Sequence, residues 1–131
     1  IAEPGSTAVE SLVARAEATG TAVISRAEVV AALGKAERLQ VVSRALAARA
    51  VAAFSADWEH LVRLQVGEAL VARAARLAWE QALRGYDAVH LAAALAWREH
   101  LGETITVATY DRELWRAARA TDLEAWPAAL G

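Results

Sequence analysis

The sequence contains no cysteine and no methionine, and only two of its 131 residues are proline. Without cysteine the chain has no disulfide, no thiolate zinc site and no cysteine nucleophile, which agrees with a reducing compartment such as the cytoplasm. No apolar run reaches the roughly 20 residues of a membrane helix, and no signal-peptide pattern opens the chain. We therefore expect a cytoplasmic protein with no membrane partner.

An excess of positive charge is also absent, since 14 Lys and Arg residues stand against 16 Asp and Glu residues for a net charge of −2. This balance does not indicate a nucleic-acid-binding protein, although a local basic rim around an acidic pocket has the same charge count. Hydrophobic residues make up 56% of the chain and charged residues 23%, which indicates a packed globular protein. No linker, repeat or low-complexity segment divides it, so we predict a single domain over residues 1–131.

The apolar pattern predicts helices that alternate with short strands. Helices are expected over residues 9–16, 28–33, 39–50, 67–84 and 87–101 and from residue 111 onward, and strands near residues 21–24, 60–66, 105–108 and 123–126. Gly20, Gly34 and Gly85 are each expected to end a helix. Because strands joined by short helical crossovers pair in parallel, the predicted fold class is α/β, a three-layer α/β/α sandwich around a short parallel sheet.

Three carboxylates stand at or near the starts of predicted helices. Glu28 and Asp111 each follow a predicted strand, and Asp87 opens an otherwise apolar helix. In a parallel sheet the carboxyl ends of strands lie near the N-termini of helices, so these acids are expected at one edge. Each acid alone has a simpler explanation as a helix cap or a partner of the helix dipole. Together the three favour a divalent cation, and oxygen ligands favour Mg²⁺ or Mn²⁺ over zinc.

Three segments of the chain closely resemble a PIN domain, specifically the VapC toxins of bacterial type II toxin–antitoxin systems. The segments are Ser25-Arg26-Ala27-Glu28-Val29-Val30-Ala31-Ala32-Leu33, Tyr86-Asp87-Ala88-Val89-His90-Leu91-Ala92-Ala93-Ala94 and Thr109-Tyr110-Asp111-Arg112-Glu113-Leu114. The resemblance implies an endoribonuclease that depends on Mg²⁺ or Mn²⁺, with RNA as its substrate and a cognate VapB-like antitoxin protein as its inhibitor. Glu28, Asp87 and Asp111 match three acidic positions of the family, which implies that they are catalytic and bind the metal.

The start of the chain departs from the family pattern. Family members begin with a strand that carries a further aspartate, whereas this sequence begins Ile1-Ala2-Glu3-Pro4-Gly5-Ser6. We expect that the usual N-terminal strand precedes this sequence and is missing from it. The chemistry implied is hydrolysis of RNA phosphodiesters by water. Asp87 is then the principal metal ligand, Glu28 a ligand or a base that orients the water, and Asp111 a ligand of a second ion or a supporting group.

Other side chains are weaker candidates for the site. Thr109 is placed to hydrogen-bond Asp111 or a water bound to the metal, although a threonine at the end of a strand more often has only a structural role. His90 is interpreted as a hydrogen-bonded core residue. The five tryptophans are expected mainly in the core or in a subunit interface. Candidate phosphate contacts are the arginines Arg26, Arg84, Arg112 and Arg116, of which Arg112 is favoured by its closeness to Asp111.

Two further functions stay open from the residues alone. The first is a non-catalytic PIN-like binding or assembly module, which the missing first acid favours. The second is a PIN nuclease directed at DNA, because no motif in the sequence separates RNA from DNA. The resemblance also implies a homodimer. The RNA target, the cleavage position, the number of metal ions and the identity of the antitoxin have no signal in the sequence.

Overall fold

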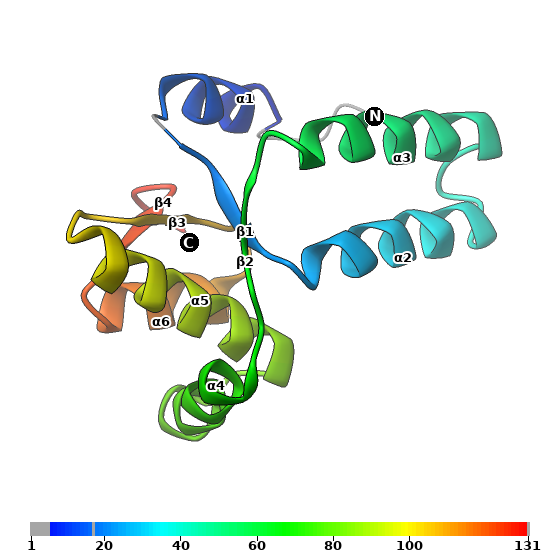
Figure 1. Ribbon diagram of the computed structural model, residues 1–131. Helices are drawn as coiled ribbons and strands as arrows, with labels where there is room; N and C mark the ends of the chain where they lie inside the picture. Colours follow the sequence, from blue (N-terminus) through cyan, green and yellow to red (C-terminus); the bar gives the residue numbers. More distant parts are fainter. Residues whose placement is uncertain (1–5, 17, 131) are drawn as a thin grey trace. The chain divides into compact units, whose positions relative to one another are not determined.

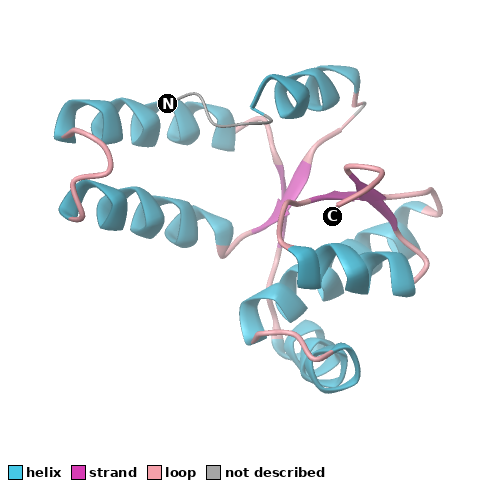
Figure 2. Ribbon diagram, turned by 180° about the vertical axis from the view of Figure 1, so that it is seen from behind, coloured by secondary structure: helices cyan, strands magenta, loops and turns pink. Residues whose placement is uncertain are grey.

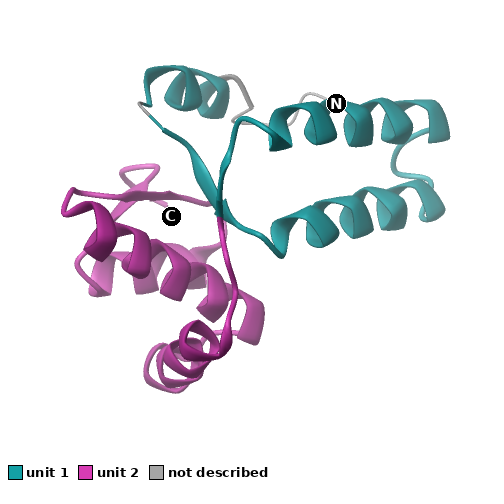
Figure 3. Cartoon of the chain, in the orientation of Figure 1, with its two compact units in different colours: residues 1–63 teal, residues 64–131 magenta. Residues whose placement is uncertain are grey.

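The computed structural model describes residues 6–16 and 18–130. These residues form six helices and four short strands, which divide between two compact units, residues 1–63 and residues 64–131 (Figure 3). No helix in the described part of the chain combines the length and the apolar composition that crossing a bilayer requires. The start of the chain, where the first acidic strand of the family is expected to be missing, lies outside the described residues. The single domain stays a prediction.

The first unit consists mainly of helices. Its elements are α1 (Ser6–Arg15), β1 (Gly20–Ala22), α2 (Ser25–Arg38), α3 (Arg44–Trp58) and the beginning of β2 (Val62–Leu64), which pairs with β1 (Figure 1). Ser43 caps α3, because its hydroxyl accepts a hydrogen bond from the Leu46 N–H at 3.1 Å. Helices α2 and α3 pack against each other as a hairpin, and Trp58 at the end of α3 is buried.

Gly34 does not end a helix, which corrects the prediction from the sequence. Helix α2 runs through it to Arg38, and the chain turns at Leu39 and Gln40, where Gln40 has a φ of 60°. A glycine inside a helix costs about 1 kcal/mol relative to alanine, and the good helix formers around it outweigh that cost. The first strand is also displaced, because β1 is Gly20–Ala22 and the next two residues form the turn into α2.

The second unit begins with two consecutive helices, which a strand, a helix and a further strand follow. Its elements are α4 (Glu68–Gln81), α5 (Gly85–Leu101), β3 (Thr106–Ala108), α6 (Arg112–Ala120) and β4 (Glu124–Trp126) (Figure 2). Strands β3 and β4 pair in parallel, with Val107 opposite Ala125. Helix α4 already ends at Ala82, which takes a left-handed φ of 54°, so Gly85 begins α5 instead of ending α4. The parallel pair between alternating helices confirms the predicted α/β class.

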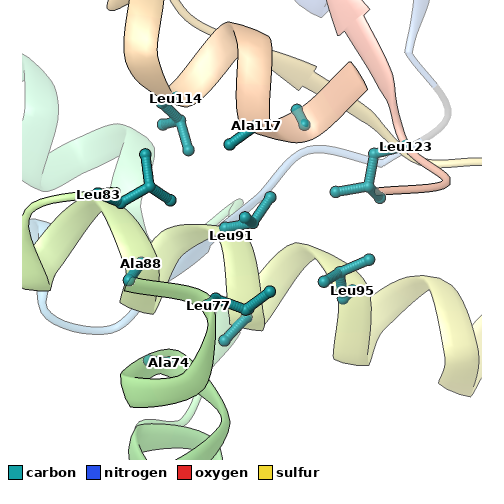
Figure 4. Packing of buried hydrophobic residues seen from close by; sticks show 11 residues of the cluster. Ala74, Leu77, Leu83, Ala88, Leu91, Leu95, Leu114, Ala117 and Leu123 are labelled. Carbon is teal, nitrogen blue, oxygen red and sulfur yellow. The ribbon is translucent and has the colours of Figure 1, made fainter. Parts of the chain in front are cut away.

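Leucine and alanine side chains from α4, α5 and α6 form the core of the second unit. Leu91 and Ala92 of α5 are fully buried, and Leu114 and Ala117 of α6 face Leu91 across the core (Figure 4). Small side chains on α5 allow close packing of its neighbours, and close packing restricts movement of the backbone. The first turn of α5, where Asp87 lies, is therefore held firmly against this core.

Candidate functional site

Asp87 is a buried carboxylate at the N-terminus of an apolar helix. It is the third residue of α5, and only 4% of its surface is exposed. The apolar positions that follow it in α5 pack into the core and fix the helix that carries it. A buried charge needs a partner, since the cost of removing it from water is otherwise several kcal/mol. The N-terminal helix dipole favours the carboxylate, and Arg84 supplies a direct partner.

Asp111 lies between β3 and α6 and caps the helix. Its Oδ1 accepts a hydrogen bond from the Leu114 N–H at 3.0 Å. Its own N–H donates to Thr109 Oγ1, also at 3.0 Å, which confirms the predicted contact between Thr109 and Asp111. The ring of Tyr110 packs against Trp126 of β4, with 5.8 Å between the ring centroids. These contacts fix the turn and leave Asp111 Oδ2 for another partner.

Arg84 joins the two carboxylates. Its Nε donates to Asp87 Oδ2 at 3.0 Å, and its Nη2 donates to Asp111 Oδ2 at 2.9 Å. The same Nη2 lies 3.0 Å from Asp87 Oδ2, so one nitrogen is within contact distance of both oxygens. The guanidinium also lies over the Tyr86 ring, 5.1 Å from its centroid. The hydrogen bond and charge of Asp87 raise the pKa of Arg84, with smaller contributions from Tyr86 and Asp111.

The two acids differ in exposure, and this gives the site an open side. The side chain of Asp87 is 6% exposed and that of Asp111 is 34% exposed, whereas Arg84 is 63% exposed. The two carboxylates are therefore more buried than the Arg84 guanidinium that contacts them, and the guanidinium is accessible to solvent. Their oxygens suit Mg²⁺ or Mn²⁺, and both already point at one cation, so the donor set fits a divalent ion. In the described part of each unit, no three His, Asp or Glu side chains gather into a group that could hold a metal.

Glu28 belongs to the first unit. It lies in the first turn of α2 and is half-buried, and its backbone N–H bonds the carbonyl oxygen of Ile24. Next to it, the hydroxyls of Thr21 and Ser25 share a hydrogen bond of 2.7 Å that fixes the junction of β1 and α2. The role predicted for Glu28 stays a prediction. His90, which the sequence placed in the core, is half-buried on α5.

The sequence did not single out Arg84 among the candidate arginines. Arg112 was favoured there because it follows Asp111, but the contact with both acids comes from Arg84. Arg116 pairs with Glu113, and Arg26 lies over the ring of Trp58. A usable signal did exist, because a residue three positions before Asp87 lies one helical turn away from it.

The tryptophans divide between core and surface. Trp58 is only 3% exposed and Trp115 donates from Nε1 to the Pro127 carbonyl oxygen at 2.7 Å, as expected for packed aromatics. Trp79 on α4 is 90% exposed, so the core does not account for it.

Comparison with known families matches residues 2–120 to the PIN domain. No curated protein matches the chain. PIN domains are typically nucleases that use divalent metal ions, which supports a hydrolase of this general kind. The match covers most of the sequence and agrees with the short parallel strands between helices, so the predicted small α/β sandwich is confirmed. The chain belongs to the PIN domain family.

Proposed function

We propose that this protein is an endoribonuclease that depends on Mg²⁺ or Mn²⁺ and is the toxin of a type II toxin–antitoxin pair. The observation that carries the proposal is the convergence of Asp87 Oδ2 and Asp111 Oδ2 on the single guanidinium of Arg84. Asp87 lies in the first turn of α5 and Asp111 caps α6, and both carboxylates face the same position. PIN domains are typically metal-dependent nucleases, so membership of that family supports binding of a catalytic metal ion at this position.

The three acidic residues have different roles in the proposed site. Asp87 and Asp111 hold the metal, and the proposal assigns Glu28 to the same task or to orienting the attacking water. A divalent ion held by these residues would supply activation of the attacking water and would offset the charge that develops on the phosphate. Asp87 acts from a largely buried position, where electrostatic interactions are screened less than at the surface. Asp111 keeps its orientation because Oδ1 and the backbone N–H are both hydrogen-bonded.

The choice of RNA and of a toxin role comes from the VapC-like segments around Glu28, Asp87 and Asp111. The proposal therefore includes a VapB-like antitoxin as partner, expected to be encoded by a short gene next to this one and to co-purify with the protein. Binding of that partner should suppress cleavage of RNA.

The test is Mg²⁺-dependent cleavage of a structured RNA by the full-length protein and by its Asp87→Asn variant. We expect the variant to lose about 100-fold or more in rate, because a neutral amide is a poor ligand for a hard cation. Asp122→Asn is the matched control, because it removes the same charge from an exposed residue. Asp122 follows the C-terminus of α6, whereas Asp111 caps the N-terminus of that helix. The φ of Asp122, 43°, is one that asparagine also adopts.

Three results would contradict parts of the proposal. Equal rates for Asp87→Asn and the wild type would remove Asp87 from the site. Faster cleavage of a DNA of the same sequence would replace RNA by DNA as the substrate. A folded wild-type protein that neither binds Mn²⁺ nor cleaves would instead be the non-catalytic binding module.

A further inference from the structure

We propose that Arg84 is a built-in counter-ion that occupies the cation position between Asp87 and Asp111 and competes with the divalent metal for it. The inference rests on the proposed function, because it concerns the metal site assigned there. It adds a regulatory residue, since Arg84 then sets the metal concentration at which the site fills.

The geometry makes arginine and metal alternatives. Arg84 Nη2 lies 3.0 Å from Asp87 Oδ2 and 2.9 Å from Asp111 Oδ2. A Mg²⁺ ion held by Asp87 and Asp111 would take its ligands from the same carboxylates that Arg84 contacts. A guanidinium has no lone pair to offer a metal and keeps its proton at all ordinary pH values. Two positive charges that approach the same two oxygens repel each other, so occupancy of this position by the guanidinium disfavours occupancy by the metal.

Asp87 and Asp111 are held in place by contacts that Arg84 does not share, which favours exchange of the guanidinium for a metal ion. Asp87 is buried in the first turn of α5, and Asp111 is held by its cap bond to Leu114 and its bond to Thr109. Arg84 precedes α5, and its side chain is 63% exposed. Withdrawal of the guanidinium into water thus leaves the acids in place and needs no change in the core.

Arg84 also offsets the repulsion between the two carboxylates when no metal ion is bound. Two carboxylates at one site repel unless a positive charge lies between them. The guanidinium bridges them, so the chain can fold before it meets a metal ion. Because the guanidinium itself is largely exposed, water reduces the free energy of its ion pairs, so the competition should weaken metal binding by about fivefold and not abolish it.

The test is calorimetric titration of the full-length protein with Mn²⁺, with Arg84→Gln as the main variant. Glutamine keeps part of the side-chain length and removes the charge, and we expect its dissociation constant for Mn²⁺ to fall by about fivefold. Arg76→Gln is the matched control, because it removes the same charge from an exposed position on α4. Its affinity should equal that of the wild type.

A second measurement observes Arg84 directly. The Nε–H resonance of Arg84 is assigned by its loss in Arg84→Gln and then followed while diamagnetic Mg²⁺ is added. Displacement predicts that this resonance moves toward the position of freely exposed arginines. A resonance that stays unchanged when Mg²⁺ is bound would overturn the inference.

The outcomes separate this inference from the proposed function. If the wild type binds Mn²⁺ and Arg84→Gln binds it equally or more weakly, the competition is wrong while the metal site stands. If folded wild type and Arg84→Gln both fail to bind Mn²⁺, the metal site itself is wrong and the inference fails with it. Tighter binding by Arg84→Gln, lost again when Asp87→Asn is added, supports both.

Discussion

At the scale of single residues, Asp111 uses its two carboxylate oxygens for different purposes. Oδ1 caps α6 through Leu114, and Oδ2 meets Arg84. One oxygen therefore contributes to stability, and the other contributes to the site. Substitutions that keep an oxygen but lose the charge can separate the two contributions.

We predict that Asp111→Ala lowers the free energy of unfolding by about 1 kcal/mol, because the Leu114 N–H loses its acceptor. Asp111→Asn should remain close to the wild type, since its amide oxygen can accept the same hydrogen bond. Urea denaturation of the three proteins measures the difference. An equal loss in both variants would mean that the charge, and not the cap, provides the stability.

The sequence predicted the two acids better than it predicted the group between them. Asp87 and Asp111 stand out because each carboxylate is near the start of a helix, and the structure brings both to one guanidinium. Among the arginines, Arg84 is marked only by its position three residues before Asp87. Which long side chain reaches a carboxylate depends on the turn between α4 and α5, and that turn follows from the left-handed residue Ala82.

At the scale of elements, an ion pair joins α4 to α5. Arg73 donates from Nη1 and Nη2 to the two carboxylate oxygens of Glu99, at 2.8 Å and 2.6 Å. The hydrogen bond from Arg73 lowers the pKa of Glu99. The paired geometry is favourable, but Glu99 is 53% exposed, so water reduces its contribution.

A double-mutant cycle with Arg73→Gln and Glu99→Gln should give a coupling of about 0.2–1 kcal/mol at neutral pH. Because the pKa of Glu99 is lower in the folded protein, the coupling is fully present above the unfolded pKa. It is lost as the pH falls through the folded pKa, where the carboxylate takes up a proton. Urea denaturation over this acidic range measures it, and a coupling that persists in acid would contradict an ionic origin.

The predicted elements failed where a single glycine was taken as a stop. Gly34 lies inside α2 because the residues on both sides favour a helix and α2 packs against α3. Gly85 begins α5, because α4 has already ended at Ala82, where the backbone takes a left-handed conformation. Periodicity identified the long helices, whereas their ends depend on backbone angles that non-glycine residues also adopt.

At the scale of the whole molecule, alternation of strands and helices was enough to predict an α/β fold. The division into two compact units at residues 63 and 64 was not predicted. No run of proline, glycine or serine marks that boundary, so the composition gives no sign of it.

We predict that the full-length protein is a homodimer, as the resemblance to VapC toxins implies. The exposed Trp79 is consistent with an apolar surface that a partner covers. Light scattering over a range of concentrations should give twice the mass of one chain. A mass equal to one chain at every concentration would contradict the prediction.

The separate roles of the two Asp111 oxygens bear on what a single-base mutation in the gene would do. The codons for aspartate and asparagine differ by one base, and Asp111→Asn leaves an oxygen on the Leu114 N–H while it removes the negative charge that Oδ2 presents to Arg84. One point mutation can therefore give a protein that folds but has lost one of the two metal ligands proposed above. Under the proposed toxin function, a cell with such an allele would escape cleavage of its RNA, and the folded variant would still bind the proposed antitoxin.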